Sequence, residues 1–166
     1  MKVKIRKLSL RYAKEFKQII DNKEIKWRGK YLSKPFPLSK VKKYITHQLR
    51  IKNYIEFAIL MDSKFVGTIC LEKIDNANRK ASIGYWVAKP YRNRGIATKA
   101  VRLVVKFGFN KLKLKRIYAK VNEDNIQSCS VLENSGFKKE GILRKNIFKD
   151  GKFYNEYYYG VINFKK

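Results

Sequence analysis

The segment from Ile83 to Thr98 constrains the fold of this chain more than any other part of its sequence. It starts with the apolar run Ile83-Gly84-Tyr85-Trp86-Val87, which is typical of a buried strand, and it reaches a helical pattern through the basic loop Arg92-Asn93-Arg94-Gly95. A strand that leads through a short glycine loop into an amphipathic helix is a building unit of mixed α/β domains. The segment therefore predicts a sheet covered by helices.

Hydrophobic periodicity extends this prediction over the rest of the chain. Alternating or continuous apolar runs predict strands, and apolar stripes spaced three and four residues apart predict helices. The predicted strands cover 3–8, 55–61, 64–74, 80–87, 116–121, 137–140 and 153–162, and the predicted helices cover 9–22, 39–51, 98–110 and 125–135. With 166 residues, 45% of them hydrophobic, the sequence predicts one folded domain over residues 1–166.

Charge and residue counts narrow the classes of site. Forty Lys and Arg against thirteen Asp and Glu give a net charge of +27. This charge indicates either a surface that binds polyanions or a proteome in which lysine is common on every protein surface. His47 is the only histidine, and Cys70 and Cys129 fit no zinc or redox spacing, so we expect no metal site and two buried thiols. No apolar run approaches the roughly 20 residues that span a bilayer, and no signal segment is visible, which predicts a cytoplasmic protein without membrane contact.

The loop between the strand and the helix has the chemistry of a pyrophosphate site. A helix start offers unpaired backbone N–H groups and the positive end of the helix dipole. Gly95 and Ala97 are small enough for a phosphate to approach the backbone, and Arg92 and Arg94 add positive charge. The spacing matches neither a Walker loop nor a dinucleotide fingerprint, and a plain strand-to-helix connection is the alternative interpretation.

These residues resemble the GNAT N-acetyltransferase family. Its loop pattern, Gln/Arg-x-x-Gly-x-Gly/Ala, is matched in full by Arg92-Asn93-Arg94-Gly95-Ile96-Ala97. The strand before the loop is similar to the ribosomal-protein N-acetyltransferase (RimJ/RimL-like) branch, and so are later residues: Asn122, Asn125, Ser128, Gly136-Phe137, Glu140-Gly141-Ile142-Leu143-Arg144 and Asp150-Gly151. The resemblance extends over about residues 3 to 162.

The resemblance implies a fold and a co-substrate. The fold is α/β, with a central, twisted, mostly antiparallel sheet that splays between strands 80–87 and 116–121 and carries helices on both faces. Acetyl-CoA would insert its pantetheine arm into the splay, where the backbone of Trp86, Val87 and Ala88 would pair with the amides and polarise the thioester carbonyl. The pyrophosphate would be held by Arg92, Asn93, Arg94, Gly95, Ile96, Ala97 and Thr98. The side chain of Asn125 would bind the pantetheine arm, cap the following helix, or do both.

The implied reaction is direct attack of a neutral amine on the thioester, with no covalent enzyme intermediate. Many family members place a tyrosine, as proton donor to the leaving thiolate, four residues before the helix-ending glycine, where this chain has Leu132. Ser128 matches a serine proposed for this role in the ribosomal-protein branch and is the candidate proton donor or thiolate stabiliser. A helix-surface serine bonded to its own backbone is the alternative.

The general base is missing from the two positions where relatives carry a glutamate, which here hold Ser82 and Ile147. Glu72 and Glu156 remain as candidates, although carboxylates at strand ends without a catalytic role are the simpler interpretation. A water chain to backbone carbonyls would serve instead of a side-chain base.

The missing base favours an acceptor of low pKa. A protein α-amine has a pKa of about 7.7–8.0, against about 10.4 for lysine or a polyamine, and a net charge of +27 disfavours a polycationic acceptor. We therefore predict acetylation of a protein or peptide N-terminus, as in the ribosomal-protein branch. A small amine such as a polyamine or an aminoglycoside is the second interpretation, and a non-catalytic ribosome- or nucleic-acid-binding protein is the third.

Partner surfaces are predicted in three places. The basic surface predicts ribosome association, and the aromatic strand 153–159 is either a homodimer interface or core. The segment from Lys23 to Pro37 is predicted to be a loop or a broken helix, and its residues Trp27, Tyr31 and Phe36 would border the acceptor site or anchor the segment to the core.

Overall fold

The computed structural model describes residues 1–21 and 36–164. Its strands and α-helices are β1 (Val3–Lys7), α1 (Ala13–Asp21), α2 (Leu38–Arg50), β2 (Ile55–Met61), β3 (Lys64–Asp75), β4 (Lys80–Val87), α3 (Ile96–Asn110), β5 (Arg116–Asn122), α4 (Ile126–Glu133), β6 (Lys138–Lys149) and β7 (Lys152–Ile162). Two short 3-10 helices, η1 (Leu10–Tyr12) and η2 (Lys89–Tyr91), precede α1 and α3. The mixed α/β class is confirmed.

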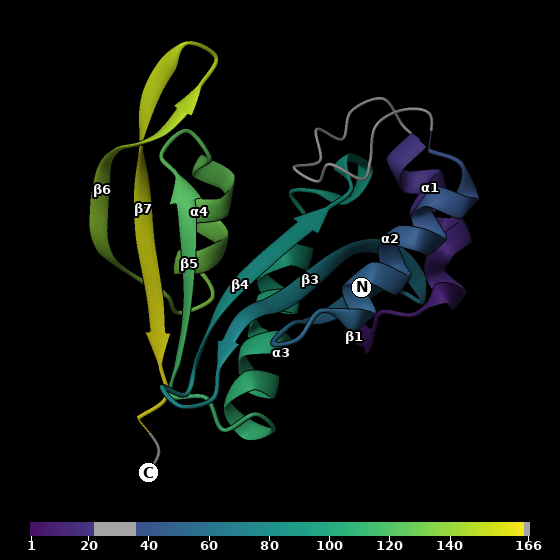
Figure 1. Ribbon diagram of the computed structural model, residues 1–166, viewed down its shortest axis with the longest axis horizontal. Coiled ribbons are helices and arrows are strands. Elements are labelled where there is room, and N and C mark those ends of the chain that lie inside the picture. The colour runs from purple at the N-terminus through teal and green to yellow at the C-terminus, as the bar shows by residue number, and fades with distance from the viewer. Residues whose placement is uncertain (22–35, 165–166) are drawn as a thin grey trace.

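The strands form one sheet in the order β1-β2-β3-β4-β5-β7-β6. Neighbouring strands are antiparallel, except that β4 and β5 run parallel and are joined by α3. β4 and β5 pair only from Lys80↔Arg116 to Ser82↔Tyr118, and beyond that point they diverge (Figure 1). The predicted splay of a mostly antiparallel sheet is thus confirmed.

Helices cover both faces of the sheet because its strands alternate apolar side chains between two cores. Phe57, Ile59 and Ile69 pack with residues of α3, and Leu132 of α4 joins this cluster. Ala58 lies in a second cluster with residues of α1 and α2. In Figure 1, α1 and α2 lie in front of the sheet and α3 behind it. This arrangement leaves the front of the sheet uncovered beside α2.

Several element boundaries differ from the prediction. The predicted helix 9–22 begins with the 3-10 helix η1, and α1 starts only at Ala13. α2 begins at Leu38 after Pro37, rather than at Ser39. α3 begins at Ile96, two residues before the predicted start, because Gly95 is its left-handed N-cap residue. β6 continues to Lys149, past the predicted end at 140, and nearly all of its residues are exposed.

The irregular segment predicted over 23–37 lies mostly outside the described residues, and so do Trp27 and Tyr31. Phe36 is described, and it is buried in the core formed with α1 and α2, so it acts as a core anchor. None of the helices in residues 1–21 and 36–164 is long and apolar enough to cross a membrane.

Candidate active site

A cavity of about 1100 Å³ opens where β4 and β5 diverge. Its lining comes from α2, β2, β3 and β4 on one side and from β5, α4 and β7 on the other. The buried polar side chains of the described residues, Glu56, Thr68, Ser82 and Asn122, all line it. Buried polar groups are costly unless they are paired, so their gathering at one cavity marks a functional site.

The strand register explains why these side chains meet. Glu56 lies opposite Cys70, and Cys70 lies opposite Gly84, so the three occupy one row across β2, β3 and β4. Glu72 lies opposite Ser82 in the next row. Directly paired residues share a face of the sheet, and this is the face that α1 and α2 leave uncovered beside the splay.

The end of β4 presents one residue's backbone to the splay. The N–H of Ala88 donates to the carbonyl of Val66 at 2.9 Å, so Ala88 faces β3. Successive residues of a strand direct their backbone groups to opposite sides, which turns Val87 toward the splay and Trp86 toward β3. Nε of Arg92 confirms this orientation by donating to the Val87 carbonyl at 2.8 Å. Of the three predicted backbone contacts, Val87 therefore lies on the open edge.

The predicted pyrophosphate loop follows β4 after the short 3-10 helix η2. Gly95 has φ +70°, with nothing within 4 Å of the position that a Cβ would take, so its backbone is openly accessible. The first intrahelical bond of α3 runs from the N–H of Lys99 to the carbonyl of Gly95, which leaves the N–H groups of Ile96, Ala97 and Thr98 at the helix start.

The charge at this helix start is positive. No acidic residue lies in the first turn of α3, and the side chains of Arg92, Asn93 and Arg94 are exposed. The positive end of the helix dipole and two guanidinium groups together favour an anion there.

The opposite wall of the cavity is the start of α4. The side chain of Asn125 caps the helix, accepting the N–H of Ser128 at 3.2 Å, so the predicted cap is confirmed. The hydroxyl of Tyr85 on β4 donates to the carbonyl of Ser128 at 3.2 Å, and burial raises the pKa of Tyr85 to about 12. Ser128 and Asn125 both line the cavity, as does Leu132, whose side chain is fully buried.

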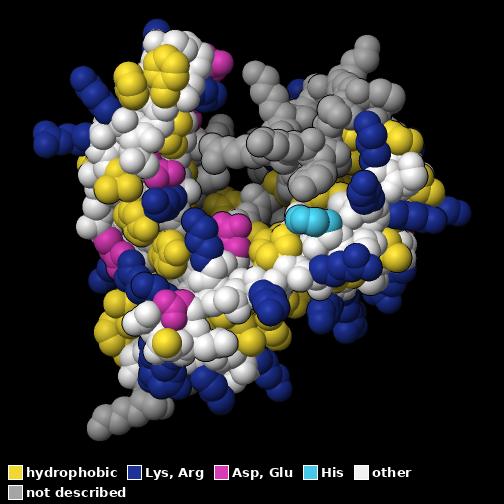
Figure 2. Space-filling model, viewed as in Figure 1, with side chains coloured by type: hydrophobic (Ala, Val, Ile, Leu, Met, Phe, Trp, Pro, Cys, Tyr) yellow, Lys and Arg dark blue, Asp and Glu magenta, His cyan; other side chains and the backbone are white. Residues whose placement is uncertain are grey.

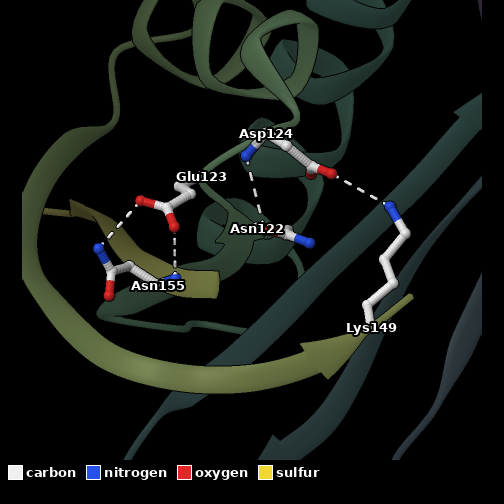
Figure 3. A network of polar contacts seen from close by, with 5 residues as sticks. All are labelled: Asn122, Glu123, Asp124, Lys149 and Asn155. Atoms are coloured by element: carbon white, nitrogen blue, oxygen red, sulfur yellow. Dashed lines mark hydrogen bonds and ion pairs between the residues drawn. The ribbon is translucent and has the colours of Figure 1, made fainter. Parts of the chain in front are cut away.

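A polar network fixes the turn that carries Asn125 (Figure 3). The carboxylate of Glu123 accepts the backbone N–H of Asn155 at 2.7 Å and its side-chain amide at 2.9 Å. Lys149 donates to Asp124 at 3.1 Å, and the N–H of Asp124 reaches the side chain of Asn122 at 3.5 Å. The β6–β7 hairpin thereby holds the end of β5 and the start of α4 in place.

Of the predicted site residues, Trp86, Asn125 and Ser128 line the cavity. Val87, Ala88 and the loop lie beyond the cavity lining, at the end of β4 and the start of α3. The two positions at which the resemblance implied a glutamate base also differ in location. Ser82 lines the cavity, whereas Ile147 on β6 does not.

Glu56 is a cavity residue that the sequence analysis did not identify. Its side chain is 5% exposed, and the hydroxyl of Tyr54 donates to its carboxylate at 3.0 Å. Burial raises the pKa of Glu56 to about 7, against hydrogen bonds from Thr68, Tyr54 and Tyr44 that lower it. The sequence contained one signal for this residue: a lone charge inside the apolar strand Ile55–Met61.

The other candidate carboxylates differ from Glu56 in environment. Glu72 is half-buried, opposite Ser82. Glu156 accepts the side-chain amide of Asn146 at 2.8 Å and lies 3.6 Å from the ammonium group of Lys120.

The two thiols also differ from each other. Cys129 is buried as predicted, whereas Cys70 is half-buried and lines the cavity, so the prediction of two buried thiols is wrong for Cys70. Burial raises the pKa of Cys70 to about 12, which keeps it a neutral thiol.

The surface around this site is basic without a single patch. Figure 2 shows Lys and Arg side chains spread over the face that carries the splay. A hollow lies between the part of the molecule formed by β5, β6 and β7 and the part that carries α1 and α2. Acidic side chains are few on this face, and some of them lie beside the hollow.

The family follows from comparison with known proteins. The family profile described as "Acetyltransferase (GNAT) domain" matches residues 2–138. The chain belongs to the GNAT family. The fold, the splay and the glycine loop at the start of α3 are those that the sequence resemblance implied.

Curated relatives within the family have different names. A putative ribosomal N-acetyltransferase of Bacillus subtilis is 36% identical over 66% of this chain and 60% of its own length. The spermidine N(1)-acetyltransferase of Escherichia coli is 28% identical over 60% of this chain and 53% of its own length. The matched part thus spans less than two thirds of each relative.

Solved structures of the family match over nearly the whole chain. The crystal structure of a probable acetyltransferase has a TM-score of 0.81 at 31% identity and covers 96% of this chain and 92% of that one. The microcin C7 self-immunity acetyltransferase, in complex with acetyl-CoA and AMP, has a TM-score of 0.82 at 26% identity, with 97% and 92% covered.

Proposed function

We propose that this chain transfers the acetyl group of acetyl-CoA to a primary amine, and that the acceptor is the α-amine of a protein or peptide. The observation that carries the proposal is the splay itself. An open strand edge at Val87 leads, through η2 and the glycine loop, to a helix start with free N–H groups and two exposed arginines. A site of this form suits a ligand with an amide-containing arm and a diphosphate.

In this proposal the pantetheine arm occupies the splay as an added strand. Its amides pair with the open edge of β4 at Val87, the form of recognition known as β-augmentation. Trp86 and Ala88 position that edge through their bonding toward β3. Asn125 keeps its side-chain amide N–H groups for the arm, because its cap uses only the side-chain oxygen.

The pyrophosphate lies against the loop and the first turn of α3. The N–H groups of Gly95, Ile96, Ala97 and Thr98 would donate to its oxygens, with Arg94 and Asn93 beside them. Arg92 has two roles, since its Nε is used on Val87 while its terminal nitrogens remain for the phosphate.

The chemistry is attack of a neutral amine on the thioester carbon. The N–H of Val87 on the open edge stabilises the charge that develops on the carbonyl oxygen. Ser128, on the opposite wall, donates a proton to the thiolate of coenzyme A as it leaves. No covalent enzyme intermediate is required.

The α-amine acceptor is supported by the relative named a putative ribosomal N-acetyltransferase, at 36% identity. A small polyamine is the second candidate, supported by a relative named a spermidine N(1)-acetyltransferase and by the carboxylates of Glu56, Glu72 and Glu156 on the cavity. Lys52, Lys73 and Lys120 line the same cavity and offset that charge, which favours the singly charged acceptor. Ribosome association and homodimer formation stay predictions.

An acceptor screen with labelled acetyl-CoA tests the proposal. Labelling of peptide α-amines, but not of N-terminally blocked peptides or polyamines, supports the first candidate, and labelling of spermidine alone supports the second. Acetyl-CoA binding without transfer to either class would leave a non-catalytic binding protein. Failure of coenzyme A to bind or to raise the melting temperature contradicts the site itself.

A further inference from the structure

Glu56 is a buried carboxylate whose described partners are all hydroxyl groups. Tyr54 donates to it at 3.0 Å, and Tyr44 and Thr68 also form hydrogen bonds with it. Among the ion pairs of residues 1–21 and 36–164, none involves Glu56. Ionised carboxylates are rarely buried without a cation, so a 5% exposed glutamate on a cavity wall is suited to a cation that arrives from outside.

The position of Glu56 is suitable for contact with an acceptor. Glu56, Cys70 and Gly84 form one row across three neighbouring strands, and all three residues line the cavity. Strands lie about 4.8 Å apart, so Glu56 and Gly84 are about 10 Å apart at the backbone, and Val87 lies three residues, roughly 10 Å, further along β4. The glutamate side chain and the acceptor amine cover part of this distance, and a short chain of waters in the cavity covers the rest.

Glu56 is the carboxylate closest to α2 in the cavity, and the groups directly around it are uncharged. The side chain of Tyr44 comes from α2, and Tyr54 lies just before β2, the strand that carries Glu56. Thr68 and Cys70 come from the neighbouring strand β3. Further out, Glu72 of β3 and the exposed Lys52 and Lys73 line the cavity.

We propose that Glu56 receives the acceptor amine: its carboxylate binds the incoming ammonium group and accepts the proton that the amine must lose before it attacks the thioester. This inference rests on the proposed acetyl transfer and supplies the general base that is missing at Ser82 and Ile147. The base has moved from β4 to β2, two strands away in the same sheet.

The proton balance is complete with the groups on the two walls. The ammonium N–H bond breaks, its proton passes to the Glu56 carboxylate, and the freed lone pair forms the new N–C bond at the thioester carbonyl. As the C–S bond breaks, the second N–H proton of the tetrahedral intermediate passes to the hydroxyl oxygen of Ser128 while the hydroxyl proton of Ser128 passes to the thiolate, so Ser128 ends the step unchanged. The products are the amide and the thiol of coenzyme A, and Glu56 then releases its proton to water.

The strength of this base is sufficient for one class of amine. Because burial brings the pKa of Glu56 to about 7, its proton affinity is within about one unit of a protein α-amine and more than three units below that of a lysine or polyamine. Each pKa unit makes the proton transfer tenfold less favourable, so Glu56 can deprotonate an α-amine at a cost of about tenfold, whereas a lysine or polyamine costs more than about a thousandfold. The advantage of the α-amine comes from its own lower pKa, and Glu56 is a strong enough base for that class.

The test is the pH profile of kcat/KM for a peptide acceptor in the wild type and in Glu56→Gln. In the wild type we expect an inflection near pH 7, followed by a plateau toward the pKa of the amine. In Glu56→Gln we expect kcat/KM to be about 10²-fold lower and to rise steadily until the amine itself loses its proton. With an acceptor that is already neutral at the assay pH, the deficit of the variant should shrink.

Glu72→Gln is the matched control, since it removes a carboxylate of the same cavity one row away. It should keep the inflection near pH 7. Loss of the inflection in Glu72→Gln, with retention in Glu56→Gln, overturns the proposal. So does Glu56→Gln with wild-type kcat/KM.

A purely structural role of Glu56 is separated by binding and by a second variant. Glu56→Gln should bind acetyl-CoA with unchanged affinity. Tyr54→Phe keeps the carboxylate but removes a hydrogen bond to its charged form, so the inflection should move to higher pH by up to about one unit. An inflection that does not move in Tyr54→Phe contradicts the proposal. A wild type that binds acetyl-CoA but acetylates no amine contradicts the proposed function instead.

Discussion

The hydroxyl of Tyr85 on β4 donates to the main-chain carbonyl of Ser128 on α4 at 3.2 Å, and this bond joins the two walls of the splay. Ser128 is also held from its other side, because its N–H is accepted by the cap residue Asn125. The two bonds fix the main chain of Ser128, and this residue lines the cavity. This is the arrangement expected of a residue that must meet a leaving group at a fixed position.

Ser128→Ala should therefore lower kcat by about 10²-fold without weakening acetyl-CoA binding, because the hydroxyl acts only as the thiolate leaves. Steady-state kinetics and a binding isotherm for acetyl-CoA provide the two measurements. Ser130→Ala is the control, since Ser130 is exposed on the same helix and lies off the cavity. Unchanged turnover in Ser128→Ala would remove this residue from the mechanism.

Gly95→Ala should weaken coenzyme A binding by at least about tenfold. An alanine at φ +70° costs of order 1 kcal/mol, and its methyl group would extend into the open space through which the phosphate approaches the backbone. The measurement is calorimetric titration with coenzyme A. Gly136→Ala is matched to it, because Gly136 also has a positive φ and open space around it but ends α4. Equal losses of affinity in the two variants would show that backbone strain, and not phosphate access, is responsible.

The segment that carries the cofactor site could be predicted because its signals are local. The strand Lys80–Val87 was predicted with its observed bounds, and the glycine loop indicated both the turn and the helix start. The start of α3 was placed two residues late because Gly95, rather than a polar side chain, is the N-cap residue. β6 was cut short because its exposed residues show no alternation of apolar and polar side chains, and its length depends on pairing with β7.

The acceptor side could not be predicted in the same way, because it depends on register. Glu56 meets the cavity only through its pairing with Cys70, and nothing in the sequence specifies that α2 leaves this face open. The family resemblance implies a base on β4 or after residue 144, at positions that hold Ser82 and Ile147 in this chain. A lone charge in an apolar strand was the signal that remained, and its meaning became clear only with the sheet order.

Asn155→Ala should destabilise the fold by about 1–3 kcal/mol. The side chain of Asn155 donates to Glu123 at 2.9 Å and accepts the N–H of Lys145 at 2.9 Å, so the alanine leaves both partners without it. The loss is measured by urea unfolding. Lys149→Ala removes the exposed pair with Asp124 and the exposed contact of the ammonium group with the Tyr154 ring, and should cost no more than about 1 kcal/mol. If the two variants lose the same stability, the part-buried bond from Asn155 to Glu123 does not dominate this turn.

Glu56→Gln should stabilise the folded protein at pH 8, although the same substitution removes the proposed base. The pKa of Glu56 is raised from 4.5 to about 7 in the folded chain, so the folded state binds the proton more tightly than the unfolded state does. This group makes its whole contribution to the free energy of unfolding below about pH 4.5, where it is protonated in both states. That contribution is lost as the pH rises to about 7. Glutamine carries no charge at any pH, so the variant should gain up to about 3 kcal/mol over the wild type at pH 8 and nothing near pH 4.

Urea unfolding of the wild type and Glu56→Gln across this pH range measures the difference. Glu72→Gln is the control, because it removes a carboxylate of the same cavity that is only half-buried, so it should gain less stability than Glu56→Gln at pH 8. A Glu56→Gln variant that is less stable than the wild type at pH 8 would mean that the three hydroxyl groups hold the ionised carboxylate more strongly than burial opposes it. The pKa of Glu56 would then lie below its ordinary value, and the residue would be too weak a base for an α-amine.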